Sequence, residues 1–366
     1  MDETDPNIKF DTDGLCTHCS NYFNNIDPVW KNNGENEFKI KKIAKKIKQE
    51  NIGNEFDCIL GISGGVDSSY LTYYAKEILG LNPLIFHVDA GWNSELAVSN
   101  IDKIITGLNL ELYTEVIDWK EMQDLQLSYF KSGVPCLDTP QDHVFFAAMY
   151  NFANKNKIKY ILNGGNYSTE CVREPLEWHY HASDLKQLKN IHQTYGKVEL
   201  KTLPLSDIFK YKIYYKYFKR MKVIQPLNFI KYEKKKAITL LKEKFNWSEY
   251  KYKHYESRFT RFYEGYWLLE KFGYDKRKAH LSSLILTGQL SRTEAINELK
   301  NRPYSEKEKI DDFNYISKKL GISESELINL FNSKNKSFKD FKSNYHLIQF
   351  FVSLSRILKI ERRLIH

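Results

Sequence analysis

The chain has 366 residues, of which 42% are hydrophobic and 28% are charged, and this composition predicts a globular protein of roughly two or three domains. No apolar run approaches ~18 residues, and the N-terminus is acidic without an apolar stretch, so we expect neither a membrane span nor a signal peptide. Five cysteines do not make a disulfide framework in a chain of this length, which favours a cytoplasmic protein. The net charge of +9 suits nucleic acid, a nucleotide-sugar or an acidic partner.

The first 35 residues are rich in turn-forming residues and contain the motif Cys16-Thr-His-Cys19. One C-x-x-C pair supplies at most half of a tetrahedral zinc site, so the motif is either part of a Zn²⁺ site or a pair of unligated thiols. Residues 36–51 predict a lysine-rich amphipathic helix that buries Phe38, Ile40, Ile43 and Ile47. We expect residues 1–50 to form a separate N-terminal segment.

Residues 56–69 contain the most informative pattern in the chain. A buried strand is predicted over 56–62, a turn at Ser63-Gly64-Gly65, and a helix from Asp67 onward. A glycine-rich turn that leads into a helix N-terminus binds anions, because its backbone N–H groups are unpaired and the helix dipole is positive there. We expect the whole loop to bind phosphate groups, through Ser63, Gly64, Gly65, Val66, Asp67, Ser68 and Ser69. The spacing is neither that of a Walker loop nor that of a dinucleotide-binding loop.

The next segments alternate between strands and helices. Strands are predicted over 84–90, 110–117 and 159–162, and helices over 94–108, 119–131 and 141–156. This alternation predicts an α/β fold with an open parallel sheet and helices on both faces, within one domain over 51–232. Ligands bind at the carboxyl ends of such strands, so we expect the phosphate loop to meet two further groups of residues. These are His87 and Asp89, and the turn of Gly164, Gly165 and Asn166.

The remainder of the chain is predicted to be mainly helical. A helix is expected over 184–193, and residues 233–366 read as a helical substrate- or partner-binding region. Three capping boxes are predicted, at Ser291 with Glu294, Ser305 with Glu308 and Ser323 with Glu326. Residues 311–331 fit a helix-turn-helix or a plain helical hairpin, and we prefer the hairpin. Residues 338–365 predict an apolar and basic helical tail.

The hexapeptide Ser-Gly-Gly-Val-Asp-Ser over 63–68 resembles the signature of the PP-loop ATP pyrophosphatases, a superfamily with a HUP-type, Rossmann-like fold. Further stretches resemble one branch of it, the N-acetyl sugar amidotransferases of surface-polysaccharide biosynthesis. They are Pro140-Gln-Asp-His143, Asn163-Gly-Gly-Asn-Tyr-Ser-Thr-Glu170, Ala182-Ser-Asp-Leu-Lys186, His254-Tyr-Glu-Ser-Arg-Phe-Thr-Arg261 and Lys276-Arg-Lys-Ala-His280.

This resemblance implies that ATP and Mg²⁺ convert the acetamido group of a nucleotide-activated sugar to an acetamidine. Ammonia would come from a separate class I glutaminase subunit, since no glutaminase domain is apparent in this chain. Relatives commonly carry an earlier C-x-x-C that pairs with the one at Cys16 and Cys19, and this chain has no cysteine upstream. A structural zinc is therefore in doubt.

Asp67 is our first candidate for a magnesium ligand, although it also suits an N-cap. Asp142 and His143 at a helix start suit orientation of the substrate or movement of a proton from ammonia. Arginines suit a diphosphate or a carboxylate, because a guanidinium binds oxyanions with two parallel hydrogen bonds. The candidate substrate-binding residues are Thr169, Glu170, Arg173, His254, Glu256, Arg258, Arg261, Lys276, Arg277 and His280.

Two alternatives remain open. The first is a PP-loop tRNA thiolase that uses Cys136 and Cys171, which follow the third strand and the second glycine-rich turn. The second is a non-enzymatic nucleotide- or DNA-binding protein that uses residues 311–331, although no basic reading helix is evident. We expect the nucleotide-sugar and not nucleic acid to be the partner.

Overall fold

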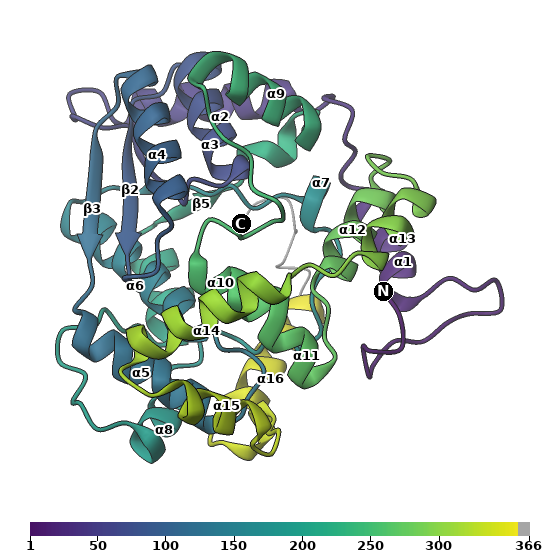
Figure 1. Cartoon of the computed structure of the whole chain (residues 1–366). Coiled ribbons are helices and arrows are strands. Elements are labelled where there is room, and N and C mark those ends of the chain that lie inside the picture. Colours follow the sequence, from purple (N-terminus) through teal and green to yellow (C-terminus); the bar gives the residue numbers. More distant parts are fainter. Residues whose placement is uncertain (358–366) are drawn as a thin grey trace.

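A computed structural model describes residues 1–357, and within them five strands form one fully parallel sheet in the order β3-β2-β1-β4-β5 (Figure 1). This order reverses between β1 and β4, which lie next to each other although four α-helices, one π-helix and two strands separate them in the chain. The strands are β1 (Cys58–Gly61), β2 (Pro83–Asp89), β3 (Leu112–Val116), β4 (Tyr160–Leu162) and β5 (Lys222–Ile224).

Side chains of the central strand point alternately to the two faces of the sheet. Cys58 and Leu60 belong to a core beneath α2, α3, α4 and α9, whereas Ile59 belongs to a core beneath α6 and η3. All three side chains are fully buried, as expected for a sheet covered on both faces. The covering elements are α2 (Glu37–Glu50), α3 (Val66–Tyr73), η2 (Tyr74–Ile78), α4 (Glu95–Leu108), α6 (Thr139–Lys155), η3 (Lys210–Phe218), η4 (Pro226–Phe229) and α9 (Lys234–Phe245).

A second large core joins α5 (Trp119–Ser132) and α8 (Leu185–Tyr195) to the C-terminal helices. Buried aromatic residues dominate it: Phe130, Phe259, Phe262 and Trp267 meet edge to face or at a tilt. The predicted domain boundary between residues 232 and 233 therefore does not divide the two cores, because each core contains residues from both sides of it. The C-terminal elements are α10 (Arg258–Phe262), η5 (Tyr263–Trp267), α11 (Leu268–Phe272), α12 (Arg277–Leu286), α13 (Arg292–Lys300), α14 (Glu306–Leu320), α15 (Glu324–Asn332), η6 (Phe338–Asp340) and α16 (Tyr345–Ile357).

The N-terminal 35 residues form α1 (Thr17–Asn21) and η1 (Tyr22–Ile26) with long turns, and they pack against α12 through Ala279 and against the segment around α7 (Tyr167–Glu170). Figure 1 shows this purple segment beside α12 and α13, away from the sheet. Trp30 is fully buried and its ring contacts Tyr167. The N-terminal segment therefore packs against α7, the helix that follows the second glycine-rich turn.

The predicted fold class is confirmed: the sheet is open and parallel, helices cover both faces, and the C-terminal region is mainly helical. Sequence reasoning missed β5, because this strand is only three residues long and follows a Tyr- and Lys-rich segment without alternation. Residues 311–331 fall in two helices joined by a short turn, α14 and α15, an arrangement common to both alternatives.

The capping boxes at Ser291 and Ser305 are present. At Ser323 the prediction was wrong in part, since the serine caps the helix but Glu326 does not return the bond. The tail begins with η6 rather than a continuous helix, and its last predicted residues, 358–365, lie outside the described residues. No helix within residues 1–357 has the length and apolar character needed to cross a membrane.

Candidate active site

The turn after β1 has the strained backbone that its glycines predict. Gly64 has a φ of +84°, and a Cβ atom there would lie 2.8 Å from the carbonyl oxygen of Ala97. Ser63 and Ser68 bond to each other across the turn, and the Ser63 N–H points to the Ser68 hydroxyl at 3.3 Å. The helix α3 begins at Val66, so the loop ends on a helix N-terminus as predicted. Ser69, by contrast, is fully buried in that helix and faces neither cavity described below.

The loop is held from one side by residues 247–256, which are far away in sequence. The indole N–H of Trp247 and the hydroxyl of Tyr250 both donate to the Gly64 carbonyl, at 3.1 and 3.2 Å. Glu256 accepts from the Ser63 hydroxyl at 3.2 Å, and burial raises the pKa of its carboxyl. These contacts occupy the carbonyl of the turn, so the turn is fixed before any ligand arrives.

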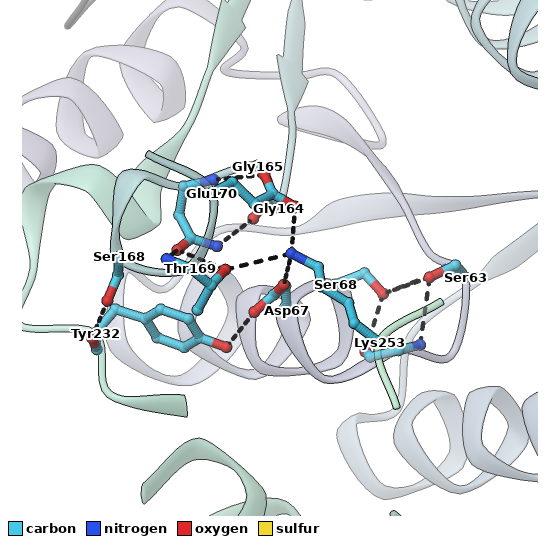
Figure 2. A network of polar contacts seen from close by, with 12 residues as sticks. Ser63, Asp67, Ser68, Gly164, Gly165, Ser168, Thr169, Glu170, Tyr232 and Lys253 are labelled. Carbon is cyan, nitrogen blue, oxygen red and sulfur yellow. Dashed lines mark hydrogen bonds and ion pairs between the residues drawn. The ribbon is translucent and has the colours of Figure 1, made fainter. Parts of the chain in front are cut away.

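Lys253 lies between the two glycine-rich turns (Figure 2). Its ammonium is 2.5 Å from Glu170 and 3.5 Å from Asp67, and its side chain is 10% exposed. Burial alone lowers the pKa of this lysine, but the carboxylates of Glu170 and Asp67 outweigh burial and raise it above its ordinary value. Lys253 is therefore a fixed positive charge. Asp67 also accepts a hydrogen bond from the hydroxyl of the buried Tyr232.

The second glycine-rich turn, 163–166, packs directly on the first (Figure 2). A Cβ atom on Gly164 would lie 3.2 Å from the backbone nitrogen of Ser68, so this position favours glycine. Asn166 caps α7 by accepting from the N–H of Thr169 at 2.9 Å, and its amide donates to the Gly164 carbonyl. Thr169 is buried behind the turn and contacts Lys253 at 3.4 Å. The adjacency of the two turns follows from the reversal of strand order between β1 and β4.

The phosphate loop separates two cavities that share Ser63, Ser68, His254 and Glu256. The smaller, of about 220 Å³, is lined by Asp67, Gly164 and Glu170 and by three lysines, Lys234, Lys251 and Lys253. The larger, of about 440 Å³, extends from the carboxyl ends of β1 and β2 to the C-terminal helices. Apolar side chains from α6 line one side of the larger cavity: Phe145, Phe146 and Met149.

Asp67 and Glu170 offer oxygen ligands to Mg²⁺, because both are carboxylates beside the phosphate loop, and both are paired with the Lys253 ammonium in this structure. Carboxylate oxygens are the ligands that Mg²⁺ prefers, and nucleotide phosphates would supply the others. The donor set therefore fits the predicted ion.

The far end of the larger cavity is acidic. It is lined by Asp138 and Asp142 of the segment that begins α6, by Glu174, and by Glu264. Only one lysine among the lining residues neutralises them: Lys276, which lies 3.4 Å from Asp138, 3.3 Å from Glu174 and 3.0 Å from Glu264. Burial raises the pKa of Glu264 to about 8, and burial together with the Asp138 charge raises that of Asp142 to about 7.

Several predicted site residues line these cavities. His87 lines the larger cavity, and its ring nitrogens lie 2.9 Å from the Ile62 carbonyl and 2.9 Å from the Asn93 amide. His254 lines both cavities that flank the loop, with a φ of +64°. Burial lowers its pKa well below the ordinary value, so its ring is neutral at pH 7. His280 lies behind it, with ring centroids 5.4 Å apart, and lines a third cavity of about 250 Å³ together with Arg277.

Other predicted residues lie elsewhere. His143 is buried, and its two ring nitrogens form hydrogen bonds with the Ala182 carbonyl and the Ser206 N–H. It lines neither of the two cavities. Asp89 caps its own turn by accepting from the Gly91 N–H. Arg258 and Arg261 both pair with the fully buried Asp312. Arg173 is exposed near the N-terminal segment.

The Sγ atoms of Cys16 and Cys19 lie 3.5 Å apart, and His18 between them bonds instead to Asp5 at 2.7 Å. Among residues 1–357, no third Cys, His, Asp or Glu completes a metal-binding group with the two thiols. The donor set therefore does not fit a closed zinc site, which needs four ligands.

Cys136 and Cys171 are both buried, and burial raises the pKa of each thiol to about 11. They belong to different hydrophobic cores, and neither lines a cavity beside the phosphate loop. Both thiols are therefore protonated at neutral pH, and neither lines the two cavities that flank the loop.

Sequence reasoning missed the residues that complete the site: Lys253, Tyr232, Asp138, Glu174, His179 and Glu264. Asp138 lies four positions before Asp142, so the helical spacing offered a signal that was not used. The other five lie in segments whose position relative to the sheet depends on tertiary packing. Lys253 precedes His254 directly, yet a lysine among many lysines carries no signal of its own.

Residues 256–355 match the family described as LPS biosynthesis protein WbpG-like, C-terminal domain. This part of the chain is therefore similar to that domain, and we refer to residues 256–355 as the WbpG-like domain. It supplies Glu256, Glu264 and Lys276 to the cavities, whereas the sheet supplies the phosphate loop. The candidate active site thus lies where the WbpG-like domain meets the carboxyl ends of the strands.

Three solved structures are similar to parts of the chain. An NH3-dependent NAD synthetase from Campylobacter jejuni is 17% identical, with a TM-score of 0.32 over 73% of this chain and 93% of that one. The U34-tRNA thiolase NcsA from Methanococcus maripaludis is 16% identical, with a TM-score of 0.33 over 72% and 80%. An NMN synthetase from Francisella tularensis is 15% identical, with a TM-score of 0.31 over 61% and 94%. No curated protein matches the chain.

Proposed function

We propose that the protein transfers AMP from ATP to an amide oxygen of a second substrate and releases pyrophosphate. The observation that carries this proposal is the position of the phosphate loop between two cavities that share Ser63, Ser68 and Glu256. The lysine-lined cavity suits the pyrophosphate part of ATP. The α-phosphate would then lie at the boundary, where an acceptor in the larger cavity can reach it.

Adenylation supplies the leaving group that the reaction needs. The amide oxygen attacks the α-phosphorus, the bond to pyrophosphate breaks, and the amide N–H proton is lost, which gives an O-adenylyl imidate. Ammonia then adds to the imidate carbon, the C–O bond breaks, and AMP leaves as the amidine forms. Mg²⁺ bound by Asp67 and Glu170 would neutralise charge on the departing pyrophosphate.

The residues of the chain would orient and stabilise these groups. Backbone N–H groups at the start of α3 and the ammonium of Lys253 would bind the phosphates, because both are positive and fixed in place. Ser63 and Ser68 would donate hydroxyl hydrogen bonds at the boundary between the cavities. Glu256 would hold Ser63 in position through its bond to that hydroxyl.

The acceptor that we propose is the acetamido group of a nucleotide-activated N-acetyl sugar, which would become an acetamidine in surface-polysaccharide biosynthesis. Two observations support this choice: the motifs that resemble the N-acetyl sugar amidotransferases, and the match to the WbpG-like domain of LPS biosynthesis proteins. Ammonia would come from a class I glutaminase partner in the cytoplasm.

The test is mass spectrometry of N-acetyl sugar nucleotides incubated with the protein, ATP, Mg²⁺ and ammonium chloride. Replacement of the amide oxygen by NH lowers the mass by about one unit. Omission of ATP must abolish the shift. Glutamine should replace ammonium only when the glutaminase partner is added. Formation of ADP and phosphate would contradict the proposal, and so would a product of unchanged mass.

The thiolase alternative requires a thiolate beside the activated substrate. Cys136 and Cys171 do not provide one, since burial keeps both thiols protonated and both lie outside the two cavities. The DNA-binding alternative is also weakened, because α14 contributes Phe313, Ile316 and Leu320 to the second core. The amidotransferase therefore remains the function that the site supports best.

A further inference from the structure

The acidic end of the larger cavity has a geometry that hydrogen bonding does not explain. Asp138 directs one oxygen, Oδ2, to Lys276 at 3.4 Å. Its other oxygen, Oδ1, is buried and has no hydrogen-bond partner, although the residue is only 7% exposed. A buried carboxylate oxygen without a partner lowers the stability of the fold, so we expect a ligand to bind this atom.

The imidazole of His179 faces that oxygen. Nδ1 of His179 lies 3.8 Å from Asp138 Oδ1, and Nε2 lies 3.9 Å from Asp142 Oδ2. These separations are too long for hydrogen bonds. An imidazole gives one ring nitrogen to a metal ion, and the 3.8 Å between Nδ1 and Asp138 Oδ1 matches the spacing of two ligands that each lie about 2.0–2.2 Å from the ion. Nδ1 of His179 is itself buried without a hydrogen-bond partner.

One donor atom from each of Asp138, Asp142 and His179 lies within 4.8 Å of the other two. Within residues 1–357 this is the only group of three or more His, Cys, Asp or Glu side chains that meets that condition. All three residues line the larger cavity, so an ion there would keep positions open toward a ligand in the cavity.

The surrounding charge favours a cation. Four carboxylates, those of Asp138, Asp142, Glu174 and Glu264, line this end of the cavity with one lysine, Lys276. A divalent ion would bring the cluster close to neutrality. Two carboxylates and one imidazole form a mixed oxygen and nitrogen set, which suits ions such as Mn²⁺ or Zn²⁺ better than it suits Mg²⁺ alone.

We propose that Asp138, Asp142 and His179 form a divalent-metal site in the larger cavity, separate from the magnesium position at the phosphate loop. Its open positions would bind an oxygen of the second substrate, such as a phosphate or a carbonyl group. The site depends on donor geometry alone and not on the reaction proposed above.

The test is titration of the full-length protein with Mn²⁺, followed by electron paramagnetic resonance of the bound ion without any nucleotide. We expect one tightly bound Mn²⁺ with nitrogen coupling from an imidazole, and displacement of that ion by Zn²⁺. Asp142→Asn should weaken binding at least tenfold and His179→Gln should remove the nitrogen coupling. Asp142 is the better first variant, because its side chain is 36% exposed whereas that of Asp138 is 10% exposed.

Asp67→Asn is the matched control, since it removes the carboxylate at the phosphate loop and leaves the proposed donors in place. It should retain the bound Mn²⁺ and its nitrogen coupling. Circular dichroism must show each variant to be folded. The proposal is overturned if the wild-type protein binds no Mn²⁺. It is equally overturned if Asp67→Asn abolishes binding whereas Asp142→Asn does not. Because the assay contains no ATP and no sugar nucleotide, neither outcome depends on the proposed reaction.

Discussion

Lys253 and Glu170 form the closest ion pair at the phosphate loop, with 2.5 Å between the ammonium and a carboxylate oxygen. This pair joins the segment that directly precedes the WbpG-like domain to α7, which follows the second glycine-rich turn, and Asp67 at the start of α3 lies 3.5 Å from the same ammonium. One buried cation therefore touches both turns. Its position explains how two loops that are a hundred residues apart can present one binding surface.

Lys253→Met should lower the rate of ATP consumption by two orders of magnitude or more. The variant removes a fixed positive charge from the lysine-lined cavity and leaves Asp67 and Glu170 to repel the phosphates. The measurement is pyrophosphate release in the presence of the acceptor. Lys236→Met is the control, because that side chain is 75% exposed on α9 and should leave the rate unchanged. Equal rates in the two variants would exclude a role for Lys253.

Gly64→Ala should lose both stability and nucleotide binding. Its φ of +84° disfavours any side chain, and the new Cβ would also approach the Ala97 carbonyl oxygen to 2.8 Å. Gly53→Ala is a close control, because Gly53 has a φ of +85° with nothing within 4 Å of the added Cβ. We expect Gly53→Ala to cost about 1 kcal/mol of unfolding free energy and Gly64→Ala to cost more. Thermal melts with and without ATP give both numbers, and equal losses would show that the turn tolerates the contact.

Asp312→Asn should destabilise the protein by about 3 kcal/mol, at the lower end of the range for breaking a buried ion pair. Its carboxylate is fully buried and binds Arg258 and Arg261, each at 2.6 Å. The two guanidinium groups are about one-third exposed, so they can regain water when the partner is lost. Asp311→Asn, one residue earlier and exposed, is the control. Urea unfolding measures both, and similar midpoints would mean that the pair contributes little.

Glu121 predicts a pH-dependent contribution to stability. Burial raises the pKa of its carboxyl, but backbone N–H groups of Lys201, Thr202 and Leu203 donate to it and outweigh burial, so the net pKa is lowered. A lowered folded-state pKa stabilises the protein above the unfolded-state pKa of about 4.3, and this stabilisation is lost as the pH falls through the folded-state value.

Glu121→Gln should therefore cost on the order of 1 kcal/mol at pH 7, and the difference from wild type should shrink as the pH falls below about 4. Glu199→Gln is the control, since that carboxylate is 75% exposed and pairs only with Lys201 among the contacts of the described residues. Denaturant unfolding at several pH values gives the curve. A difference that stays constant between pH 7 and pH 3.5 would contradict the assignment.

The fold class and the phosphate loop could be predicted from the sequence, because both depend on local patterns of residues. A buried strand, a turn with two glycines and a helix start lie within fourteen residues, and the alternation of strands and helices implies a parallel sheet. The remaining site depends on contacts between distant segments. Arg258 and Arg261 were predicted to bind substrate because a sequence shows a charge and not its partner, which is the buried Asp312 more than fifty positions away.

The acidic end of the larger cavity illustrates the same limit. Asp142 was predicted as a site residue from its neighbours in the chain, but Glu174, His179 and Glu264 come from separate segments that meet only in the folded protein. Their approach depends on the packing of the C-terminal helices against α5 and α8, which no local period describes.

The most direct test of the account follows the amide oxygen. A nucleotide-activated N-acetyl sugar is labelled with ¹⁸O in its acetamido carbonyl and incubated with the protein, ATP, Mg²⁺ and ammonium. If that oxygen attacks the α-phosphorus and the C–O bond later breaks, the label must appear in AMP and raise its mass by about two units, while the amidine carries none. Unlabelled AMP, with the ¹⁸O retained in the sugar or released to water, would contradict adenylation of the amide.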